Sequence, residues 1–173
     1  MKAFLREILA TLALAIVIFI LLQTTIQSTV VVGPSMEPDF HDGQRLLINK
    51  AVYAFHEPER GDVIIFRSPN NDRTDYIKRI IGLPGDTIEI KDGVVYANGS
   101  PLYEPYIADP PHYTLPRQRV TQNSYFVLGD NRNNSNDSHN GWTVPRQNIT
   151  GKAWLSIWRP EWWGLAPNYS FDE

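Results

Sequence analysis

The chain has 173 residues, of which 42% are hydrophobic and 20% charged, and its formal net charge is −3. This composition is ordinary for a globular protein and excludes wholesale disorder, and the small negative charge gives no electrostatic basis for binding nucleic acid. The absence of cysteine excludes disulfides, a thiol nucleophile and a thiolate metal site. The histidines show no metal-ligand spacing and no glycine-rich phosphate loop is present, so we expect neither a metal nor an organic cofactor. The histidines are His41, His56, His112 and His139.

The N-terminus carries an uncharged apolar run at residues 8–22, preceded by Lys2 and Arg6. Taken as residues 7–26, the segment has about the 20 residues that cross a bilayer core. A cleavable signal peptide begins in the same way, but it needs a small-x-small cleavage site, and Thr25-Ile26-Gln27 is a poor match. A retained transmembrane anchor is therefore the preferred interpretation, with the cleaved signal as the alternative.

The basic residues precede the apolar run, and basic residues tend to stay on the cytoplasmic side of a membrane. The sequence therefore predicts three parts. Residues 1–6 form a short cytoplasmic N-terminus, residues 7–26 the anchor, and residues 27–173 a single extracytoplasmic domain.

After the anchor the pattern is typical of β structure. Short segments that alternate in polarity, or are wholly apolar, are predicted as strands at 29–32, 45–50, 62–67, 75–82, 87–91, 94–97, 124–128 and 149–158. Asp92-Gly93 between two of them favours a two-residue hairpin. No amphipathic helix follows the anchor. We therefore expect an all-β fold, a coiled antiparallel sheet or partly open barrel, behind one N-terminal transmembrane helix.

Three stretches do not fit the strand pattern. Residues 101–123 contain five prolines and are predicted as a long surface loop. Residues 129–148 are rich in Asn, Asp, Ser and Gly and should be solvated, unless their side chains hold something in place. The tail contains Trp162-Trp163, which fits either a contact with the membrane interface or a packed end of the core.

A turn around Ser35 has the features of a nucleophile turn. The apolar segment 29–32 ends at Gly33, which lets another chain approach closely, and Pro34 and Pro38 restrict the backbone on either side of Ser35. A rigid, narrow turn presents one hydroxyl and leaves backbone N–H groups free for an oxyanion. The alternative is an ordinary turn, since Gly-Pro-Ser is common in turns.

A serine nucleophile needs a base, and Lys78 is the candidate, because no histidine with a carboxylate partner is evident. In the predicted strand 75–82, one face carries Tyr76, Lys78 and Ile80, and the other carries Ile77, Arg79 and Ile81. Apolar neighbours would desolvate Lys78, lower its pKa and let it act as a neutral amine. The alternative is a lysine that extends from a half-buried strand into water.

The segment 129–138 directly follows the predicted strand 124–128 and is dense in short hydrogen-bonding side chains. Such a segment can form a self-bonded platform that orients its neighbours. We expect Asp130 to pair with an outward-pointing Arg79, and a hydroxyl of the segment to orient the Lys78 amine. The alternative is a solvated Asn-rich loop.

Together these segments resemble the type I signal peptidases, the serine–lysine enzymes of bacterial protein export. The resemblance covers nearly the whole chain and rests on motifs that occur in order behind the anchor. They are Pro-Ser-Met-x-Pro around Ser35, Arg-Gly-Asp-Val-Ile-Ile-Phe at 60–66, Tyr-Ile-Lys-Arg-Ile-Ile-Gly-Leu-Pro-Gly-Asp at 76–86, and Gly-Asp-Asn-Arg at 129–132 with Ser135 and Asp137-Ser138. The short spacing between Lys78 and Ser135 matches the compact members of the family.

The resemblance implies that Ser35 is the nucleophile, Lys78 the general base and the Ser35 N–H half of the oxyanion hole. Gly33 stands where some members have a serine that supplies the second oxyanion donor. The supporting residues would be Ser135, which orients the lysine, Asp130 as the partner of Arg79, and Asp137 in the same network. His139 stands where the family usually has an arginine that pairs with this aspartate.

The resemblance also implies two apolar sets. Phe66, Tyr76, Val127 and Leu128 match positions that keep the lysine dry. Val31, Val32, Met36, Phe40 and Ile77 match the shallow pockets for small substrate residues.

The implied activity is that of a membrane-bound serine endopeptidase that removes N-terminal signal peptides from exported preproteins, cutting after small-x-small sites without a cofactor. The implied partners are preproteins, membrane lipid and, functionally, the export machinery, with no nucleic acid. The implied location is the cell membrane, with the catalytic domain on its outer face.

Two other functions stay open on the sequence. One is a self-cleaving serine–lysine regulator, but such proteins carry a DNA-binding domain that does not fit in residues 1–28. The other is a membrane-tethered β domain that only binds or scaffolds, for which Ser35→Ala would leave the cellular role intact.

Overall fold

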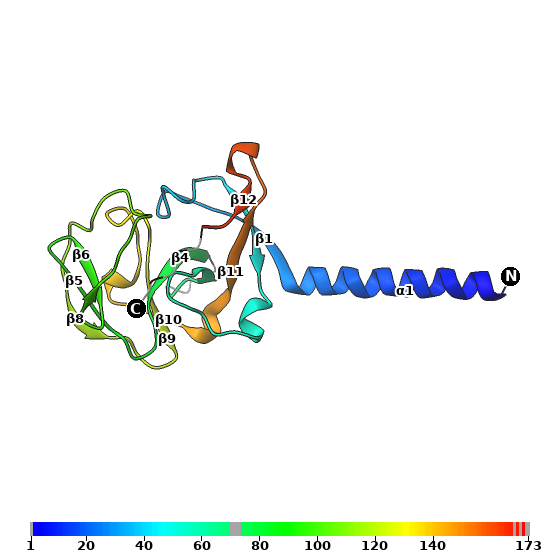
Figure 1. The fold of residues 1–173 in the computed structure, drawn as a ribbon, viewed down its shortest axis with the longest axis horizontal. Coiled ribbons are helices and arrows are strands. Elements are labelled where there is room, and N and C mark those ends of the chain that lie inside the picture. Colours follow the sequence, from blue (N-terminus) through cyan, green and yellow to red (C-terminus); the bar gives the residue numbers. More distant parts are fainter. Residues whose placement is uncertain (1, 70–73, 168, 170, 172–173) are drawn as a thin grey trace.

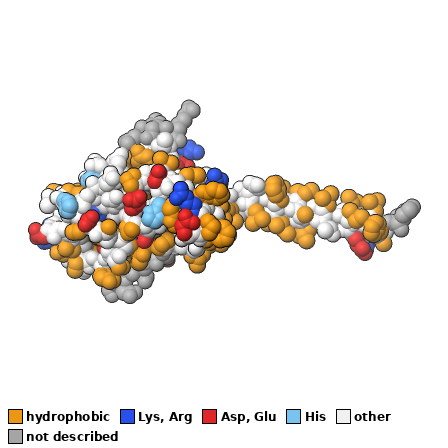
Figure 2. Space-filling model, turned by 90° about the horizontal axis from the view of Figure 1, so that it is seen from above, with side chains coloured by type: hydrophobic (Ala, Val, Ile, Leu, Met, Phe, Trp, Pro, Cys, Tyr) orange, Lys and Arg blue, Asp and Glu red, His pale blue; other side chains and the backbone are white. Residues whose placement is uncertain are grey.

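The structure is a computed structural model that describes residues 2–69, 74–167, 169 and 171. Its single long helix, α1 (Lys2–Thr25), projects away from a body of β structure (Figure 1). The helix is long and apolar enough to cross a membrane by length and composition, and apolar side chains cover most of its surface (Figure 2). The helix ends at Thr25, whose hydroxyl donates to the carbonyl of Leu21, and Ile26 already begins the first strand.

The body contains short strands and four 3₁₀ turns among the described residues. The strands are β1 (Ile26–Val30), β2 (Arg45–Asn49), β3 (Val63–Arg67), β4 (Asp75–Gly82), β5 (Thr87–Lys91), β6 (Val94–Ala97), β7 (Ser100–Pro101), β8 (Leu115–Arg119), β9 (Ser124–Leu128), β10 (Val144–Pro145), β11 (Ile149–Ser156) and β12 (Gly164–Leu165). The 3₁₀ turns are η1 (Val52–Ala54), η2 (Ser138–Asn140), η3 (Arg146–Asn148) and η4 (Pro160–Trp162).

The strands form two antiparallel sheets. The larger has eight strands in the order β1-β2-β11-β3-β4-β9-β10, with β12 paired to β11, and the smaller has the order β7-β6-β5-β8. The smaller sheet lies at the end of the body remote from α1 (Figure 1). The predicted fold class is confirmed: the body is a curled antiparallel β structure behind one apolar N-terminal helix.

Alternation along the central strand β4 separates its side chains onto two faces. Ile77 packs in one core cluster with Val63 and Ile65, whereas Ile80 packs in another with Ile64 and Phe66. Both faces of this part of the sheet are covered by apolar side chains. Lys78 and Arg79 therefore lie on opposite faces, and both are buried.

The Asp92-Gly93 hairpin is confirmed, since β5 ends at Lys91, β6 begins at Val94, and both turn residues have positive φ, at 52° and 76°. The first predicted strand, 29–32, is displaced. In the structure β1 ends at Val30, and Val31 instead exchanges backbone hydrogen bonds with Gly43 and Gln44.

The long loop predicted at 101–123 is wrong in its second half, because β8 occupies Leu115–Arg119 there. This strand lies at the edge of the smaller sheet and is mostly exposed, so its sequence does not need alternating apolar residues. Edge strands also tolerate proline, as at Pro116. The proline count therefore indicated a loop where an edge strand forms.

Contact between the two sheets generates a stability prediction. A side chain at Gly82 of β4 would lie 2.9 Å from Ile88 Cδ1 of β5 and 3.0 Å from Phe126 Cβ of β9. We expect Gly82→Ala to destabilise by about 1–3 kcal/mol through overpacking, and Ile88→Val by about 0.5–1.5 kcal/mol. The double variant should be less destabilised than the sum, since Ile88→Val removes one crowded atom. Chemical unfolding of the full chain in detergent measures this, and strict additivity would contradict the contact.

Candidate active site

The Ser35 turn is held by its own hydrogen bonds and by two buried anchors. Gly33, at φ 82°, donates its N–H to Asp42 Oδ1 at 2.7 Å. The Phe40 N–H donates to the carbonyl of Met36 at 2.9 Å, and both of these side chains are fully buried. These contacts fix the backbone on both sides of Ser35, whose side chain reaches the surface of a pocket.

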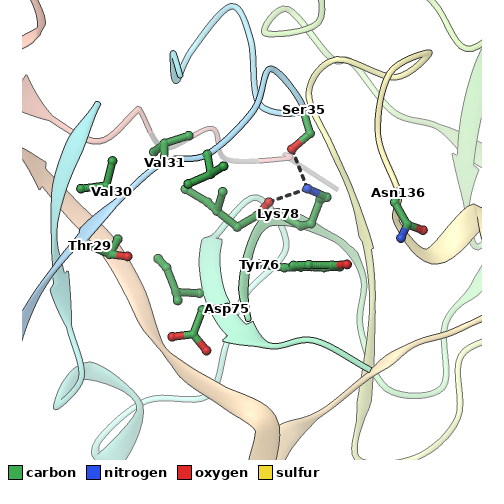
Figure 3. Close-up of a pocket in the computed structure, with 11 residues that line it drawn as sticks. Thr29, Val30, Val31, Ser35, Asp75, Tyr76, Lys78 and Asn136 are labelled. Carbon is green, nitrogen blue, oxygen red and sulfur yellow. Dashed lines mark hydrogen bonds between the residues drawn. The ribbon is translucent and has the colours of Figure 1, made fainter. Parts of the chain in front are cut away.

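The amine of Lys78 faces the hydroxyl of Ser35 (Figure 3). Lys78 Nζ lies 2.7 Å from Ser35 Oγ and donates to the carbonyl of Ile77 at 2.8 Å. Only 4% of Lys78 is exposed. This burial lowers the pKa of Lys78 to about 8, although the carboxylates of Asp137 and Asp130 act in the opposite direction. The arrangement pairs a hydroxyl with an amine that is partly neutral near neutral pH.

The apolar set expected around the lysine is mostly in place. The Tyr76 ring centre lies 5.8 Å from Lys78 Nζ, and Phe66 and Val127 belong to the core cluster on the same sheet face. Leu128 is the exception, because it packs in the cluster on the other face, with Ile81. Since side chains alternate along β9, Val127 and Leu128 cannot both face the lysine.

The side chain of Arg79 is buried, not directed outward as the sequence suggested. It forms the predicted pair with Asp130 through two hydrogen bonds, Nε to Oδ1 at 2.9 Å and Nη2 to Oδ2 at 2.7 Å. Nη2 also donates to Asp39 Oδ2 at 3.1 Å, and Nη1 donates to the carbonyl of Gly61 at 3.0 Å. The contact with Asp39 was not foreseen.

Residues 129–138 form a platform that is packed on one side only. Asp130, Arg132, Asp137 and Ser138 are buried, whereas Asn133, Asn134 and Asn136 are exposed. Asn131 donates its backbone N–H to the carbonyl of Ser35 and its side-chain amide to the carbonyl of Pro34, both at 3.1 Å. Asp137 accepts from the N–H of Gly129 at 2.9 Å and contacts His139 Nδ1 at 2.6 Å. Asn131 therefore holds the Ser35 turn, and His139 pairs with Asp137.

Ser135 lies beside the site without contacting the lysine amine. A side chain at Gly129 would collide with Ser135 Oγ and with the carbonyl of Ser35, which places these groups together. Ser135 Oγ is buried and has no hydrogen-bond partner among the described residues. The orientation of Lys78 in this structure thus comes from Ser35 and the carbonyl of Ile77.

A pocket of about 210 Å³ opens beside the Ser35–Lys78 pair. Of the expected pocket residues, Val31, Val32 and Ile77 line it. Met36 and Phe40 do not, because both are fully buried in the core cluster beneath, where they anchor the turn. The lining also includes residues that the sequence did not indicate: Thr29, Val30, Ile65, Asp75 and Asn136. They come from four separate segments, β1, β3, β4 and residues 129–138, that only the fold brings together.

The pocket runs along an open part of β4. Strand β3 pairs with β4 from Asp75 to Arg79, whereas β9 pairs with it only at Arg79, Ile80 and Gly82. Within the part of the chain that the structure describes, residues 75–78 therefore have a strand on one side only. Such an edge can pair with an extended peptide.

The two tryptophans of the tail differ. The Trp162 ring packs 5.0 Å from the ring of His41, whereas Trp163 is 66% exposed. Among the described residues, no cluster of three or more His, Asp or Glu side chains is placed to hold a metal ion.

Comparison with known proteins places the chain in a family. Residues 4–158 match the family model described as signal peptidase, peptidase S26. A protein named probable signal peptidase I-1 from Synechocystis sp. is 40% identical over 97% of this chain and 90% of its own length. Signal peptidase I S of Bacillus subtilis is 40% identical over 75% of this chain and 76% of its own.

A crystal structure of a signal peptidase I from Enterococcus faecalis agrees with the fold. Its TM-score is 0.52 at 34% sequence identity, and the match covers 56% of this chain and 97% of that one. Family model, relatives and structure agree with the resemblance carried by the sequence motifs. The chain belongs to the signal peptidase family, peptidase S26, and is a serine peptidase of the hydrolase class.

Proposed function

We propose that this protein is a membrane-anchored serine endopeptidase that removes signal peptides from exported preproteins, with Ser35 as nucleophile and Lys78 as general base. The observation that carries the proposal is the 2.7 Å contact between Ser35 Oγ and the buried amine of Lys78. A lysine with a lowered pKa beside a hydroxyl is the arrangement that activates a serine without histidine.

In the first chemical step, neutral Lys78 accepts the Ser35 proton while Oγ attacks the scissile carbonyl carbon. The tetrahedral oxyanion is stabilised by the Ser35 N–H, which has no hydrogen-bond partner among the described residues. The N–H of Gly33 is already donated to Asp42, so it does not supply a second donor in this conformation. The charged amine then protonates the leaving nitrogen, the C–N bond breaks, and the acyl group stays as an ester on Ser35.

In the second step, Lys78 removes a proton from a water that attacks the ester carbonyl. Breakdown of this second tetrahedral intermediate returns the proton to Ser35 and releases the signal peptide with a new carboxylate. Ser135, whose buried hydroxyl lies beside this site, is proposed to stabilise the amine when Lys78 moves between these partners.

The substrate is proposed to bind as an extended strand along residues 75–78 of β4. In this mode backbone hydrogen bonds give affinity, and side-chain pockets give specificity. Val31, Ile65 and Ile77 form apolar walls of this pocket. Cleavage after a small-x-small sequence is proposed because the chain belongs to the signal peptidase family.

The anchor places this chemistry where signal peptides emerge. We propose that residues 7–26 span the cell membrane with residues 1–6 in the cytoplasm, so that residues 27–173 lie on the outer face beside membrane lipid. A preprotein delivered by the export machinery would hold its signal helix in the same bilayer. Confinement to one surface raises the effective concentration of enzyme and substrate.

The first prediction concerns the catalytic pair. Ser35→Ala and Lys78→Met should each lower the cleavage of an Ala-x-Ala preprotein by about 10³-fold or more, since neither group acts alone. The control Lys91→Met removes a lysine from β5 of the smaller sheet, away from the Ser35–Lys78 pair, and this variant should cleave normally. Full activity of either active-site variant would show that its role lies elsewhere.

The second prediction concerns pH. Only the neutral amine can accept a proton, so kcat/KM should rise with pH and level off above an apparent pKa of about 8. The carboxylate of Asp137 opposes the lowering of this pKa, so Asp137→Asn should move the midpoint to lower pH. Pre-steady-state cleavage measures the chemical step. A flat profile from about pH 5 to 9 would contradict a role for Lys78 as base.

The third prediction concerns specificity. Ile77→Ala enlarges the pocket and should raise kcat/KM for a preprotein with valine or leucine in a small-residue position by about 10-fold or more. Ile90→Ala makes the same truncation in the core of the smaller sheet, away from the pocket, and should leave the preference unchanged. Competition between Ala-x-Ala and Leu-x-Ala substrates measures the change. Equal preference in both variants would mean that Ile77 does not limit side-chain size.

A further inference from the structure

Asp39 lies in the same turn as Ser35, and its side chain is only 14% exposed. Its carboxylate accepts from Arg79 Nη2 at 3.1 Å through Oδ2 and from Tyr169 Oη at 3.4 Å through Oδ1. Burial raises the pKa of Asp39, while its contacts with Arg79 and Tyr169 favour the ionised form. Burying a carboxylate costs free energy unless hydrogen bonds and opposite charges stabilise it, and Asp39 has both.

The guanidinium of Arg79 joins the segments that carry the catalytic groups. It binds Asp130 at the start of the platform 129–138, the carbonyl of Gly61 before β3, and Asp39 in the Ser35 turn. Arg79 directly follows Lys78 on β4 and points to the opposite face. A change in the distance between Asp39 and Arg79 would therefore shift the Ser35 turn relative to Lys78.

Two tyrosine rings pack against the guanidinium of Arg79. The Arg79 guanidinium carbon lies 4.2 Å from the Tyr106 ring centre and 5.0 Å from that of Tyr169. The backbone carbonyl of Tyr169 occupies the place where a side chain at Gly61 would begin, so the backbone at Tyr169 packs closely against Gly61. The Arg79 side chain has no exposed surface, so its contact with Asp39 is less screened than a contact between two surface residues.

We propose that Asp39 is a positioning residue: through Arg79 it fixes the Ser35 turn at the distance from Lys78 that proton transfer requires, and Tyr169 holds the carboxylate in place. The inference rests on the proposed Ser35–Lys78 function. Asp39 is absent from the lining of the substrate pocket, so its effect should fall on the chemical step and not on binding. Displacements of the order of an ångström cost about 100-fold in comparable sites.

The test compares Asp39→Asn with Asp92→Asn in the full chain in detergent. Asp92 is an exposed turn residue at φ 52°, a conformation that asparagine tolerates, so the control makes the same chemical change far from the site. For Asp39→Asn we expect kcat to fall about 10-fold with KM nearly unchanged. The pH midpoint should also stay at the wild-type value, since Asp39 is not among the charges that act on Lys78.

Each rate is measured well below the Tm of the variant, so that loss of folded protein does not enter. Asp39→Glu keeps the charge but displaces it, and should lower kcat by a smaller factor than Asp39→Asn. If Asp39→Asn does not fold, Asp39→Glu carries the test, with a several-fold lower kcat at unchanged KM as the expected result.

A kcat for Asp39→Asn equal to that of Asp92→Asn, or a loss confined to KM, would overturn the positioning role. Ser35→Ala is measured beside them. If Ser35→Ala is inactive while Asp39→Asn behaves as its control, only the role of Asp39 fails. If Ser35→Ala cleaves like wild type, the proposed function itself fails.

Discussion

The Lys78 amine can act as a base only where water is kept from it, and the body of the protein is arranged around that exclusion. Strand β3 pairs with β4 at Lys78, and the apolar cluster of Phe66 and Val127 covers the face on which the lysine lies. Desolvation is the largest influence on this amine and outweighs the two carboxylates that favour its charged form. The Ser35 turn completes the enclosure, since its hydroxyl is the partner of the buried nitrogen.

Arg79, the residue next to Lys78, is also buried, but its surroundings differ from those of the lysine. Arg79 is given a bidentate carboxylate, a further carboxylate and a carbonyl, whereas Lys78 has no carboxylate in direct contact among the described residues. Strand alternation makes this contrast possible, because adjacent residues face different surroundings. One residue thereby holds the segments together while its neighbour keeps a proton that is easily lost.

Much of this site could be predicted from the sequence because its parts are local. The Ser35 turn, the lysine strand and the Asn-rich platform each carry a recognisable pattern, and alternation alone separates Lys78 from Arg79. Prediction failed where packing between distant segments determines the position of a side chain. Met36 and Phe40 are apolar in a pocket or in a core alike, and only the fold shows that they are buried. Three further features depend on segments far apart in the chain, which leave no local signal. They are the edge strand β8, the contact between Asp39 and Arg79, and the contact between Tyr169 and Asp39.

The central claim is that burial makes Lys78 a neutral base, and a direct titration tests it most simply. Lysines labelled with ¹³C at Cε can be followed by NMR across pH in the full chain in detergent, with Lys78→Met to assign the signal. The account predicts a resonance that titrates near pH 8 and disappears in the variant. A Lys78 resonance that titrates near the ordinary value of 10.5 would contradict it, because the amine would then stay charged and could not take the Ser35 proton.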